Sequence, residues 1–402
     1  MKLVHGHLSY CTNIHAGESW AEHFEALKQH FPAIKKGVSP GQSMGIGLRL
    51  SNSASRDILQ ADQLQVFKKW LSENDAYVFT MNGFPYGDFH HAVVKDQVHA
   101  PDWTKHERLN YTLRLFDILA ELLPEGLEGG ISTSPLSYKY WFPNKQLVEK
   151  AMLNATHNIL SIAEHLYRIK EKRGISLHLD IEPEPDGLLE TGPEFIHWFE
   201  NYLLPLAKAV LPSRLQITDE DAIACIREHI CLCYDVCHFA IGYEPMNDIL
   251  AELSAKGIRV GKIQISAALK AGIPVDNDSR KEISDAFSQY QEPTYLHQVV
   301  ARKSDHSLIR YRDLPDALKD IANKDVEEWR AHFHVPVFAE DLGLLRSTRS
   351  DITEILKKYK SDPFTDHLEV ETYTWEVLPE ALKLPIDQSI IRELNWVKAE
   401  LK

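Results

Sequence analysis

Short apolar segments with the composition of β-strands alternate with amphipathic segments along almost the whole chain. Strands that alternate with helices form a parallel sheet, and eight such units are the number that closes a (β/α)8 barrel. The predicted strands are residues 7–14, 44–51, 76–82, 128–134, 176–182, 230–236, 259–266 and 367–373. The predicted helices lie around residues 20–31, 58–73, 104–123, 145–172, 193–210, 246–256, 314–330 and 351–360.

A doubly wound open sheet is the alternative arrangement of such units. That fold usually carries a glycine-rich phosphate-binding turn after its first strand. The corresponding turn here, residues 13–18 (NIHAGE), lacks this pattern. We therefore predict an α/β fold of the (β/α)8 TIM-barrel type, in which residues 1–402 form a single domain.

The chain is longer than a minimal barrel, and the extra length falls between the seventh and eighth strands. The stretch from Gln264 to Glu371 is several times the ~31 residues of a typical unit. It contains strand-like segments at 295–302, 307–311 and 331–338, with a helix from Pro315 to about Trp329. We predict that residues of about 270–345 form an insertion that covers the C-terminal mouth of the barrel.

Charge and hydropathy exclude some classes of partner. The net charge of −14 repels a polyphosphate backbone, so nucleic acid is not an expected partner. No stretch approaches the roughly 20 apolar residues that span a bilayer, and residues 1–20 lack the apolar region of a secretory signal. We expect a cytoplasmic protein with no membrane insertion. Cys231, Cys233 and Cys237 would share a strand face with Asp235, which leaves a soft-metal cluster as the alternative to reduced core thiols.

Polar side chains stand at the C-terminal ends of four predicted strands. They are Glu182, Asp235, Gln264 and Glu371. Side chains alternate between the two faces of a strand, and in 177–182 and 368–371 the apolar residues lie opposite the acids. If the apolar faces contact the surrounding helices, the polar side chains point into the barrel. Because TIM barrels place catalytic residues at this end, we predict that the four side chains converge on one site.

A divalent cation is the simplest way to hold this set together. Carboxylates that are packed closely repel one another, and burying them without a partner is costly. Oxygen ligands favour Mg²⁺ or Mn²⁺, whereas Mn²⁺, Co²⁺ or Zn²⁺ becomes the better choice if a histidine joins. The alternative is that each acid, taken alone, is a helix cap or a salt-bridge partner at the barrel rim.

Side chains from the loops and from the insertion are further candidates for the pocket. Each has the alternative of simple packing at the rim. These candidates are His15, Phe84, His297 and His334. His332 would share a strand face with His334, and a structural role is the favoured interpretation for both. Glu184 follows Pro183 in the loop beyond the fifth strand, so we expect it to serve the rim and not the site.

Several motifs carry a resemblance to a known superfamily. LDIEPEP contains Glu182, DVCH contains Asp235 and His238, KIQIS contains Gln264, and LEVETY contains Glu371. In these motifs the chain resembles the xylose-isomerase-like TIM-barrel superfamily of sugar isomerases and epimerases, hydroxypyruvate isomerases and AP endonucleases. The glutamine is closest to the hydroxypyruvate-isomerase type, because ketose 3-epimerases usually carry histidine there.

Over nearly its whole length the chain is also similar to the EboE proteins of the Ebo gene cluster, described as metabolite-traffic proteins. The segments that carry this similarity are SYCTNIHAGESW, GFPYG, YLHQVVAR, HFHVPVF and LEVETYTWEVLP. The similarity implies a small-molecule metabolite as partner and a functional link to other proteins of that cluster.

The superfamily resemblance implies a metal-dependent isomerase or epimerase of a small sugar-like or hydroxy-carbonyl metabolite. Glu182 and Glu371 would be the acid/base pair on either side of an enediolate, and His238 would hydrogen-bond a substrate oxygen. One alternative is a non-catalytic metabolite-binding or traffic protein of the Ebo type. The other is a metallo-phosphoesterase or AP-endonuclease-like hydrolase, which the negative charge and the absence of histidine at the ends of the second and third strands disfavour.

Overall fold

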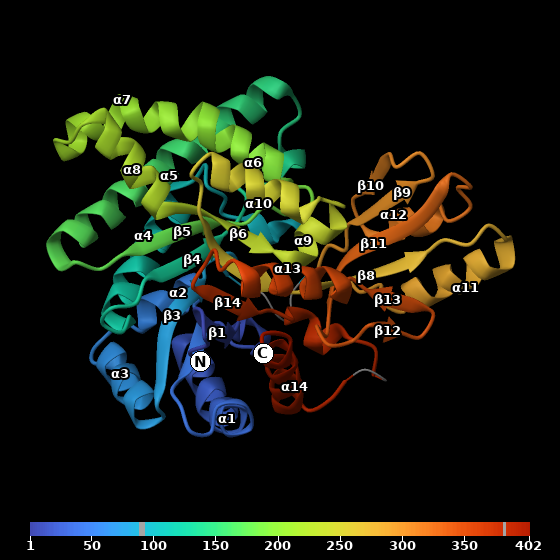
Figure 1. Ribbon diagram of the computed structural model, residues 1–402, viewed down its shortest axis with the longest axis horizontal. Coiled ribbons are helices and arrows are strands. Elements are labelled where there is room, and N and C mark those ends of the chain that lie inside the picture. The colour runs from blue at the N-terminus through green and yellow to red at the C-terminus, as the bar shows by residue number, and fades with distance from the viewer. Residues whose placement is uncertain (88–92, 381–382) are drawn as a thin grey trace.

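The computed structural model describes residues 1–87, 93–380 and 383–402, and it shows a barrel of eight parallel strands (Figure 1). The strands are β1 (His7–Tyr10), β2 (Met44–Arg49), β3 (Ala76–Asn82), β4 (Gly129–Thr133), β5 (Leu177–Ile181), β6 (Ile230–Asp235), β7 (Val260–Ile265) and β14 (His367–Val370). Each strand from β2 to β7 pairs with the next, β14 lies between β7 and β1, and a parallel bridge from Cys11 to Gly47 joins the first strand to the second. The predicted (β/α)8 barrel and all eight of its strands are confirmed.

Helices form the outer layer around this barrel (Figure 1). They are α1 (Trp20–Val38), α2 (Asn52–Asp57), α3 (Gln63–Glu73), α4 (His106–Leu122), α5 (Lys145–Arg173), α6 (Gly192–Trp198), α7 (Leu204–Leu215), α8 (Asp219–His229), α9 (Val236–Ile241), α10 (Met246–Ala255), α13 (Arg349–Ser361) and α14 (Ile386–Glu400). Local sequence sets their ends: Ser19 and Glu22 form a capping box at the start of α1, and Gly174 ends α5 in the left-handed conformation. The 3-10 turns η1 (Thr12–Ile14), η2 (Lys95–His99), η3 (Lys139–Trp141) and η5 (Tyr373–Val377) lie in the connections, and the π-helical segment η4 (Phe199–Leu203) joins α6 to α7.

The strands turn their apolar side chains to the helices and their polar side chains inward, as the alternation predicted. Inside the barrel, Lys262 Nζ lies 2.8 Å from Glu369 Oε2, and both side chains are fully buried. Gly47 makes room for this pair, because a Cβ there would lie 1.7 Å from Glu369 Oε1. A charged layer therefore fills the barrel below its C-terminal mouth.

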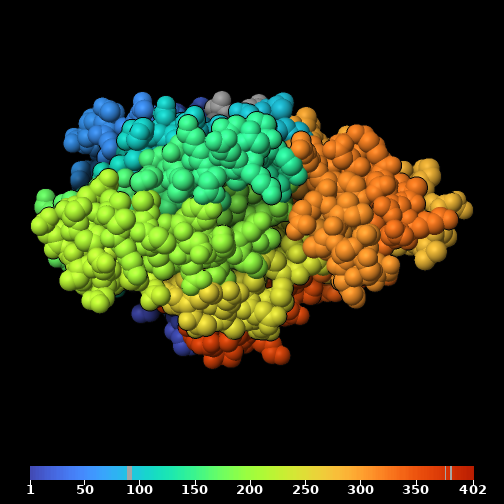
Figure 2. Space-filling model, turned by 90° about the horizontal axis from the view of Figure 1, so that it is seen from above, coloured from blue at the N-terminus to red at the C-terminus, as the bar shows by residue number. Residues whose placement is uncertain are grey.

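The predicted insertion lies between β7 and β14, and the structure shows that it forms an antiparallel sheet. Its order is β10-β9-β11-β8-β13-β12. The inserted elements are β8 (Ala267–Gly272), α11 (Asn277–Ser288), β9 (Val299–Lys303), β10 (Leu308–Tyr311), α12 (Leu314–Lys319), β11 (Val326–Val335), β12 (Asp341–Leu342) and β13 (Leu345–Ser347). Figure 2 shows most of the insertion, in orange, as a lobe beside the barrel.

Two details of the insertion differ from the prediction. The helix expected from Pro315 to about Trp329 ends at Lys319, and Trp329 belongs to β11. There it pairs with Ala301 of β9 and Ala271 of β8, so sheet pairing determines its conformation. The inserted sheet also starts earlier than expected, because β8 follows β7 after the single residue Ser266.

Among the residues that the structure describes, no helix is both long and apolar enough to cross a membrane.

Candidate metal and substrate site

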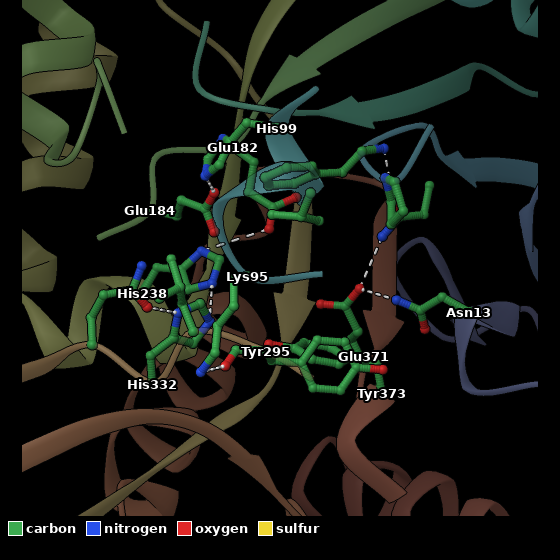
Figure 3. A pocket seen from close by; sticks show the side chains of 16 residues that line it. Asn13, Lys95, His99, Glu182, Glu184, His238, Tyr295, His332, Glu371 and Tyr373 are labelled. Atoms are coloured by element: carbon green, nitrogen blue, oxygen red, sulfur yellow. Dashed lines mark hydrogen bonds and ion pairs between the residues drawn. The ribbon is translucent and has the colours of Figure 1, made fainter. Parts of the chain in front are cut away.

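A pocket opens at the C-terminal ends of the barrel strands, where residues of the insertion also reach it (Figure 3). Its cavity volume is about 60 Å³. It is lined by Asn13, Asn82, Phe84, Pro85, Lys95, Val98, His99, Glu182, Glu184, His238, Tyr295, Leu296, Gln298, His332, Glu371 and Tyr373. The small volume suits ions, water and part of a small substrate better than a polymer.

The four predicted polar residues lie together, and two of them, Glu182 and Glu371, line this pocket. Glu182 follows β5, Asp235 ends β6, and Glu371 follows β14. One carboxylate oxygen from each lies within 4.8 Å of the other two, and the three side chains are at most 4% exposed. Gln264 of β7 donates from Nε2 to Glu371 Oε2 and, at 3.3 Å, to Glu182 Oε1. The barrel thus brings together all four residues that the strand ends predicted.

Glu371 is held by three amide groups. Asn13 Nδ2 donates to its Oε1 at 2.7 Å, Asn82 Nδ2 donates to the same oxygen at 2.9 Å, and Gln264 donates to Oε2. Burial raises the pKa of Glu371 to about 8, the charge of Asp235 adds to the rise, and the amide donors oppose it. These donors favour the carboxylate form of Glu371.

Glu182 has fewer donors. Its Oε1 accepts from Gln264, while its Oε2 is buried and has no hydrogen-bond partner among the described residues. Burial, together with the charges of Glu371 and Asp235, raises the pKa of Glu182 well above its usual value. Of the two glutamates, Glu182 is therefore the one that more readily takes up a proton.

Gln264 is oriented differently from what a metal ligand requires. Its amide nitrogen faces the two glutamates, and its Oε1 accepts from Cys233 Sγ at 3.1 Å. An amide nitrogen is a donor and offers no lone pair to a cation. In this orientation Gln264 bridges the acids, and the predicted ligation through Oε1 would need its amide group to be turned over.

Asp235 and His334 supply two further acceptor atoms. Asp235 Oδ1 accepts from Ser266 Oγ at 2.7 Å and from the backbone N–H of His238, while its Oδ2 has no partner among the described residues. His334 Nδ1 donates to the carbonyl oxygen of Glu371 at 3.2 Å, which leaves Nε2 as a buried acceptor without a partner in the described chain. Burial raises the pKa of Asp235 and lowers that of His334 to about 4.

The ligand atoms at this site suit a divalent cation. Glu182 Oε2, Asp235 Oδ2 and His334 Nε2 are buried acceptors without a donor in the described structure, and acceptors cannot satisfy one another. Ligand atoms of Asp235, His238 and His334 lie within 4.8 Å of one another, as do those of the three carboxylates. A site of carboxylate oxygens with one imidazole is of the kind that suits Mn²⁺, Co²⁺ or Zn²⁺.

A second group of ligand atoms lies in the same pocket. Atoms of Glu184, His238 and His332 are within 4.8 Å of one another, and His99 Nε2 lies 3.0 Å from Glu184 Oε1. Glu184 is only 6% exposed, so its predicted role at the rim is wrong. Burial raises the pKa of Glu184 and lowers those of His238 and His99 to about 3.

Of the four further candidates that the sequence offered for the pocket, two lie at the site and two lie elsewhere. Phe84 lines the pocket, and His334 lies against its acids. His297 is not among the lining residues described: its Nδ1 donates to the carbonyl of His332, and its Nε2 lies 2.7 Å from Glu292 Oε1. His15 is likewise not among the lining residues described. It forms a hydrogen bond with Tyr10, and its ring stacks on that of His30.

Sequence reasoning missed part of the lining. His99 and Asn82 carry no recognisable motif, and their roles come from the way η2 and β3 are packed at the mouth. A signal was present for His332, because its spacing from His334 puts both on one face of β11. That face lies toward the pocket.

Fold and site together define a TIM barrel with a buried cluster of carboxylates and histidines at the C-terminal ends of its strands. No protein-family model matches the chain, and no curated protein matches it in sequence. The similarity to EboE proteins stays a prediction.

Several solved structures are similar in fold. One is the IolI protein with a bound zinc atom, at 11% identity and a TM-score of 0.48, covering 98% of this chain and 97% of that one. Another is a xylose isomerase-like TIM-barrel protein from Mycobacterium smegmatis in complex with magnesium, at 10% identity, a TM-score of 0.48 and coverage of 99% and 98%. A D-tagatose 3-epimerase-like protein has 10% identity and a TM-score of 0.49 over 98% of this chain and 97% of that one.

Proposed function

We propose that the protein is a metal-dependent isomerase or epimerase of a small sugar-like or hydroxy-carbonyl metabolite. The observation that carries the proposal is the pair Glu182 and Glu371, which face one pocket with different hydrogen-bond surroundings. Two titratable groups whose surroundings push their proton affinities apart are the pattern of an acid/base pair. The chain supplies them at the C-terminal end of its barrel, where TIM-barrel active sites lie.

The two glutamates have different roles in this proposal. Glu371, whose carboxylate form accepts hydrogen bonds from three amides, accepts a proton from the substrate carbon. Glu182, with a raised pKa and one oxygen that lacks a partner in the described chain, holds and returns a proton. Phe84, Tyr295 and Tyr373 line the pocket and limit the access of water to the reacting carbon.

The residues that would hold the metal are Glu182, Asp235, Glu371 and His334. When bound, a divalent cation supplies Lewis-acid polarisation of a substrate carbonyl and stabilises the negative charge of an enediolate. His238, whose Nδ1 lies 3.6 Å from Glu182 Oε1, lies beside these four ligands and is not one of them.

Proton exchange tests the proposal directly. The protein is incubated in deuterated water with a panel of sugars, sugar acids and 2-oxo acids, and deuterium at the α-carbon is measured. We expect Glu182→Gln and Glu371→Gln to lower the exchange rate by about 10²–10⁴-fold, the usual contribution of general acid–base catalysis. Glu244→Gln is the matched control, because Glu244 is half-buried with its pKa raised to about 7 but lies outside the pocket lining described.

The outcomes separate the functions. Exchange that is equal in wild type and both variants overturns the proposal, as does a purified protein that holds no divalent ion and exchanges no substrate. Recovery of a bound metabolite that remains unchanged would instead support the metabolite-binding or traffic function.

A second candidate function, a metallo-phosphoesterase-type hydrolase, is favoured by one observation. His99, His238 and His332 line the pocket although the second and third strands end without histidine. Such enzymes use histidine-rich sites that hold more than one metal. Release of phosphate from small phosphate esters, or cleavage of abasic-site DNA with Zn²⁺ present, would support this function over the isomerase.

A further inference from the structure

The proposed isomerase needs one metal site, and the pocket holds ligand atoms beyond that site. Glu184, His238 and His332 are at most 6% exposed, and one ligand atom from each lies within 4.8 Å of the others. Figure 3 shows them together on one side of the pocket, with Glu371 and Asn13 on the other. The hydrogen bonds of these residues determine which of their atoms carry protons.

His238 has its proton on Nδ1. This nitrogen lies 3.1 Å from the carbonyl oxygen of Pro183, which can only accept. A neutral imidazole has one N–H, so a proton on Nδ1 leaves Nε2 with an exposed lone pair.

His332 is fixed in the same tautomer. Gln298 Nε2 donates to the carbonyl of Pro185 at 3.2 Å, so Gln298 Oε1 faces the other way, toward His332 Nδ1 at 2.8 Å. That oxygen accepts a proton from Nδ1, which leaves His332 Nε2 as an acceptor as well.

The unprotonated Nε2 atoms of His238 and His332 face each other. His238 Nε2 and His332 Nε2 are 3.1 Å apart, and two lone pairs at that distance repel unless a positive centre lies between or beside them. The spacing is close to the ~3.3 Å expected for two imidazole nitrogens on one tetrahedral ion with bonds of about 2.0–2.1 Å. A shared proton is the other solution, but it would leave a net positive ring in a buried site.

Glu184 adds an anionic ligand to the two nitrogens. Its Oε1 lies 3.0 Å from His99 Nε2 but outside hydrogen-bonding geometry, and it has no hydrogen-bond partner among the described residues. A buried carboxylate oxygen beside two unprotonated imidazole nitrogens provides the ligand atoms of a zinc-type site.

We propose that Glu184, His238 and His332 form a second divalent-cation site beside the site of Glu182, Asp235, Glu371 and His334. The two sites are adjacent, because a ligand atom of His238 also lies within 4.8 Å of ligand atoms of Asp235 and His334. Two nitrogens and one oxygen select Zn²⁺ or Co²⁺ over Mg²⁺. The segment Glu182–Pro185 organises both sites, because each glutamate serves one of them. Its two proline carbonyls fix the histidine tautomers of the second, directly for His238 and through Gln298 for His332.

Metal counting on the full-length protein tests this site. The protein is stripped with a chelator, incubated with Zn²⁺, desalted and measured by elemental mass spectrometry. We expect two equivalents of zinc in wild type and one in Glu184→Gln and in His332→Leu. When Co²⁺ is bound in place of zinc, each of these variants should lack one part of the visible ligand-field spectrum of the wild type and keep the other part.

Two control variants test whether the loss of an ion is specific to the proposed ligands. His229→Gln alters a buried histidine on α8, and Cys237→Ser alters the thiol whose sulfur lies within 4.8 Å of His332 and His334 ligand atoms. Both should keep two equivalents, and thermal unfolding followed by circular dichroism checks that each variant is folded.

The results that overturn the second site are distinct from those that overturn the isomerase. One equivalent in wild type, or two in both Glu184→Gln and His332→Leu, contradicts the second site and leaves the first intact. Loss of an ion in Cys237→Ser contradicts the assigned ligands. Binding of no zinc overturns both metal sites, whereas two equivalents without proton exchange on any substrate overturn only the isomerase.

Discussion

Glu182 and Glu371 are the same residue type in one pocket, yet their neighbours give them different proton affinities. Three amides donate to Glu371, whereas one amide donates to Glu182 and one oxygen of Glu182 has no partner in the described chain. A hydrogen bond to the charged form of an acid favours that form. Gln264 donates to both acids, so the difference between them arises from Asn13 and Asn82, which donate to Glu371.

Removing one amide should change the pH dependence of the reaction. In Asn82→Leu, the carboxylate of Glu371 loses a donor, and its pKa rises. A hydrogen bond to a charged group contributes about 1.5–3 kcal/mol, which corresponds to a shift of about 1–2 pH units. Because Glu371 must be deprotonated to accept a proton, the acidic limb of the kcat/KM profile should move to higher pH by this amount.

The measurement for Asn82→Leu is a pH–rate profile of α-carbon exchange. Asn82 Oδ1 also accepts from the backbone N–H of Phe84, so thermal unfolding of the variant reports the structural part of the effect. A profile that falls in height without moving along the pH axis would contradict the assigned role. Asn201→Leu, an exposed asparagine on η4, is the matched control.

The residues that sequence could predict are those whose position follows from strand geometry. Glu182, Asp235, Gln264 and Glu371 were predicted because each ends a strand and lies opposite an apolar face. Glu184 was misplaced because the loop after Pro183 turns back into the pocket, and nothing in local composition shows that. The amide donors were not predicted either, because an asparagine carries no periodic signal and acts only through the oxygen it reaches.

At the scale of elements, the inserted sheet completes the site that the barrel begins. β11 presents His332 and His334 to the pocket, and the backbone N–H of His332 donates to the carbonyl of Gln298. The strand was only partly predicted, because residues before Ala331 have a composition that also suits a helix. Pairing with β8 and β9 decides the conformation, and such long-range pairing is not visible in a local window.

Glu393 of α14 joins the insertion to the end of β14. Its Oε1 accepts from the backbone N–H of Val337 at 3.1 Å and from Thr372 Oγ1 at 2.7 Å. Burial raises the pKa of Glu393 to about 7, and these two donors oppose the rise. Val337 follows β11, and Thr372 follows the site residue Glu371, so this carboxyl group connects both walls of the pocket.

The raised pKa of Glu393 makes a prediction about stability and pH. The folded protein binds a proton at Glu393 up to about pH 7, whereas the unfolded chain releases it near pH 4.5. Between these values the folded state holds more protons, so the free energy of unfolding falls as pH rises, by up to about 3 kcal/mol. Glu393→Gln removes this term, and its stability relative to wild type should increase from pH 5 to pH 8.

Urea unfolding at a series of pH values measures this difference. The gain of Glu393→Gln over wild type should be constant above about pH 8 and below about pH 4. A difference between the two proteins that does not change with pH would show that Glu393 keeps an ordinary pKa in the folded state.

At the scale of the whole molecule, the barrel buries a group of carboxylates at its mouth, and their charge requires a counter-ion. The acids at the mouth should be stabilised by their cation, because a ligand that binds only the folded state adds RT ln(1 + [L]/Kd) to its stability. Chelation is therefore expected to lower the melting temperature of wild type and to lower that of Glu182→Gln by less. An equal decrease in both proteins would place the bound ion elsewhere.

Below the mouth, Lys262 links strands from different sides of the barrel. Its Nζ lies 2.8 Å from Glu369 Oε2 on β14, and it donates to the carbonyl of Met81 on β3 and to Ser132 Oγ on β4. In Lys262→Met, Glu369 would remain buried without its cation. Breaking one partner of a buried pair costs about 3–5 kcal/mol, whereas replacing both partners by apolar residues is often neutral. We therefore expect Lys262→Met to lose about 3–5 kcal/mol and the double variant Lys262→Met/Glu369→Leu to lose clearly less.

A double-mutant cycle in urea measures this coupling, with Glu369→Leu as the fourth protein. The expected result is strongly non-additive, because each single variant leaves one buried charge without a partner and the double variant leaves none. Additive losses would mean that the pair contributes through packing alone. The cycle also bears on the site, because Glu369 lies two residues before Glu371 and its charge adds to the raised pKa of that acid. If the Lys262–Glu369 pair holds β14 in register, metal binding at the mouth should weaken in Lys262→Met and also in the double variant, because neither protein keeps the pair.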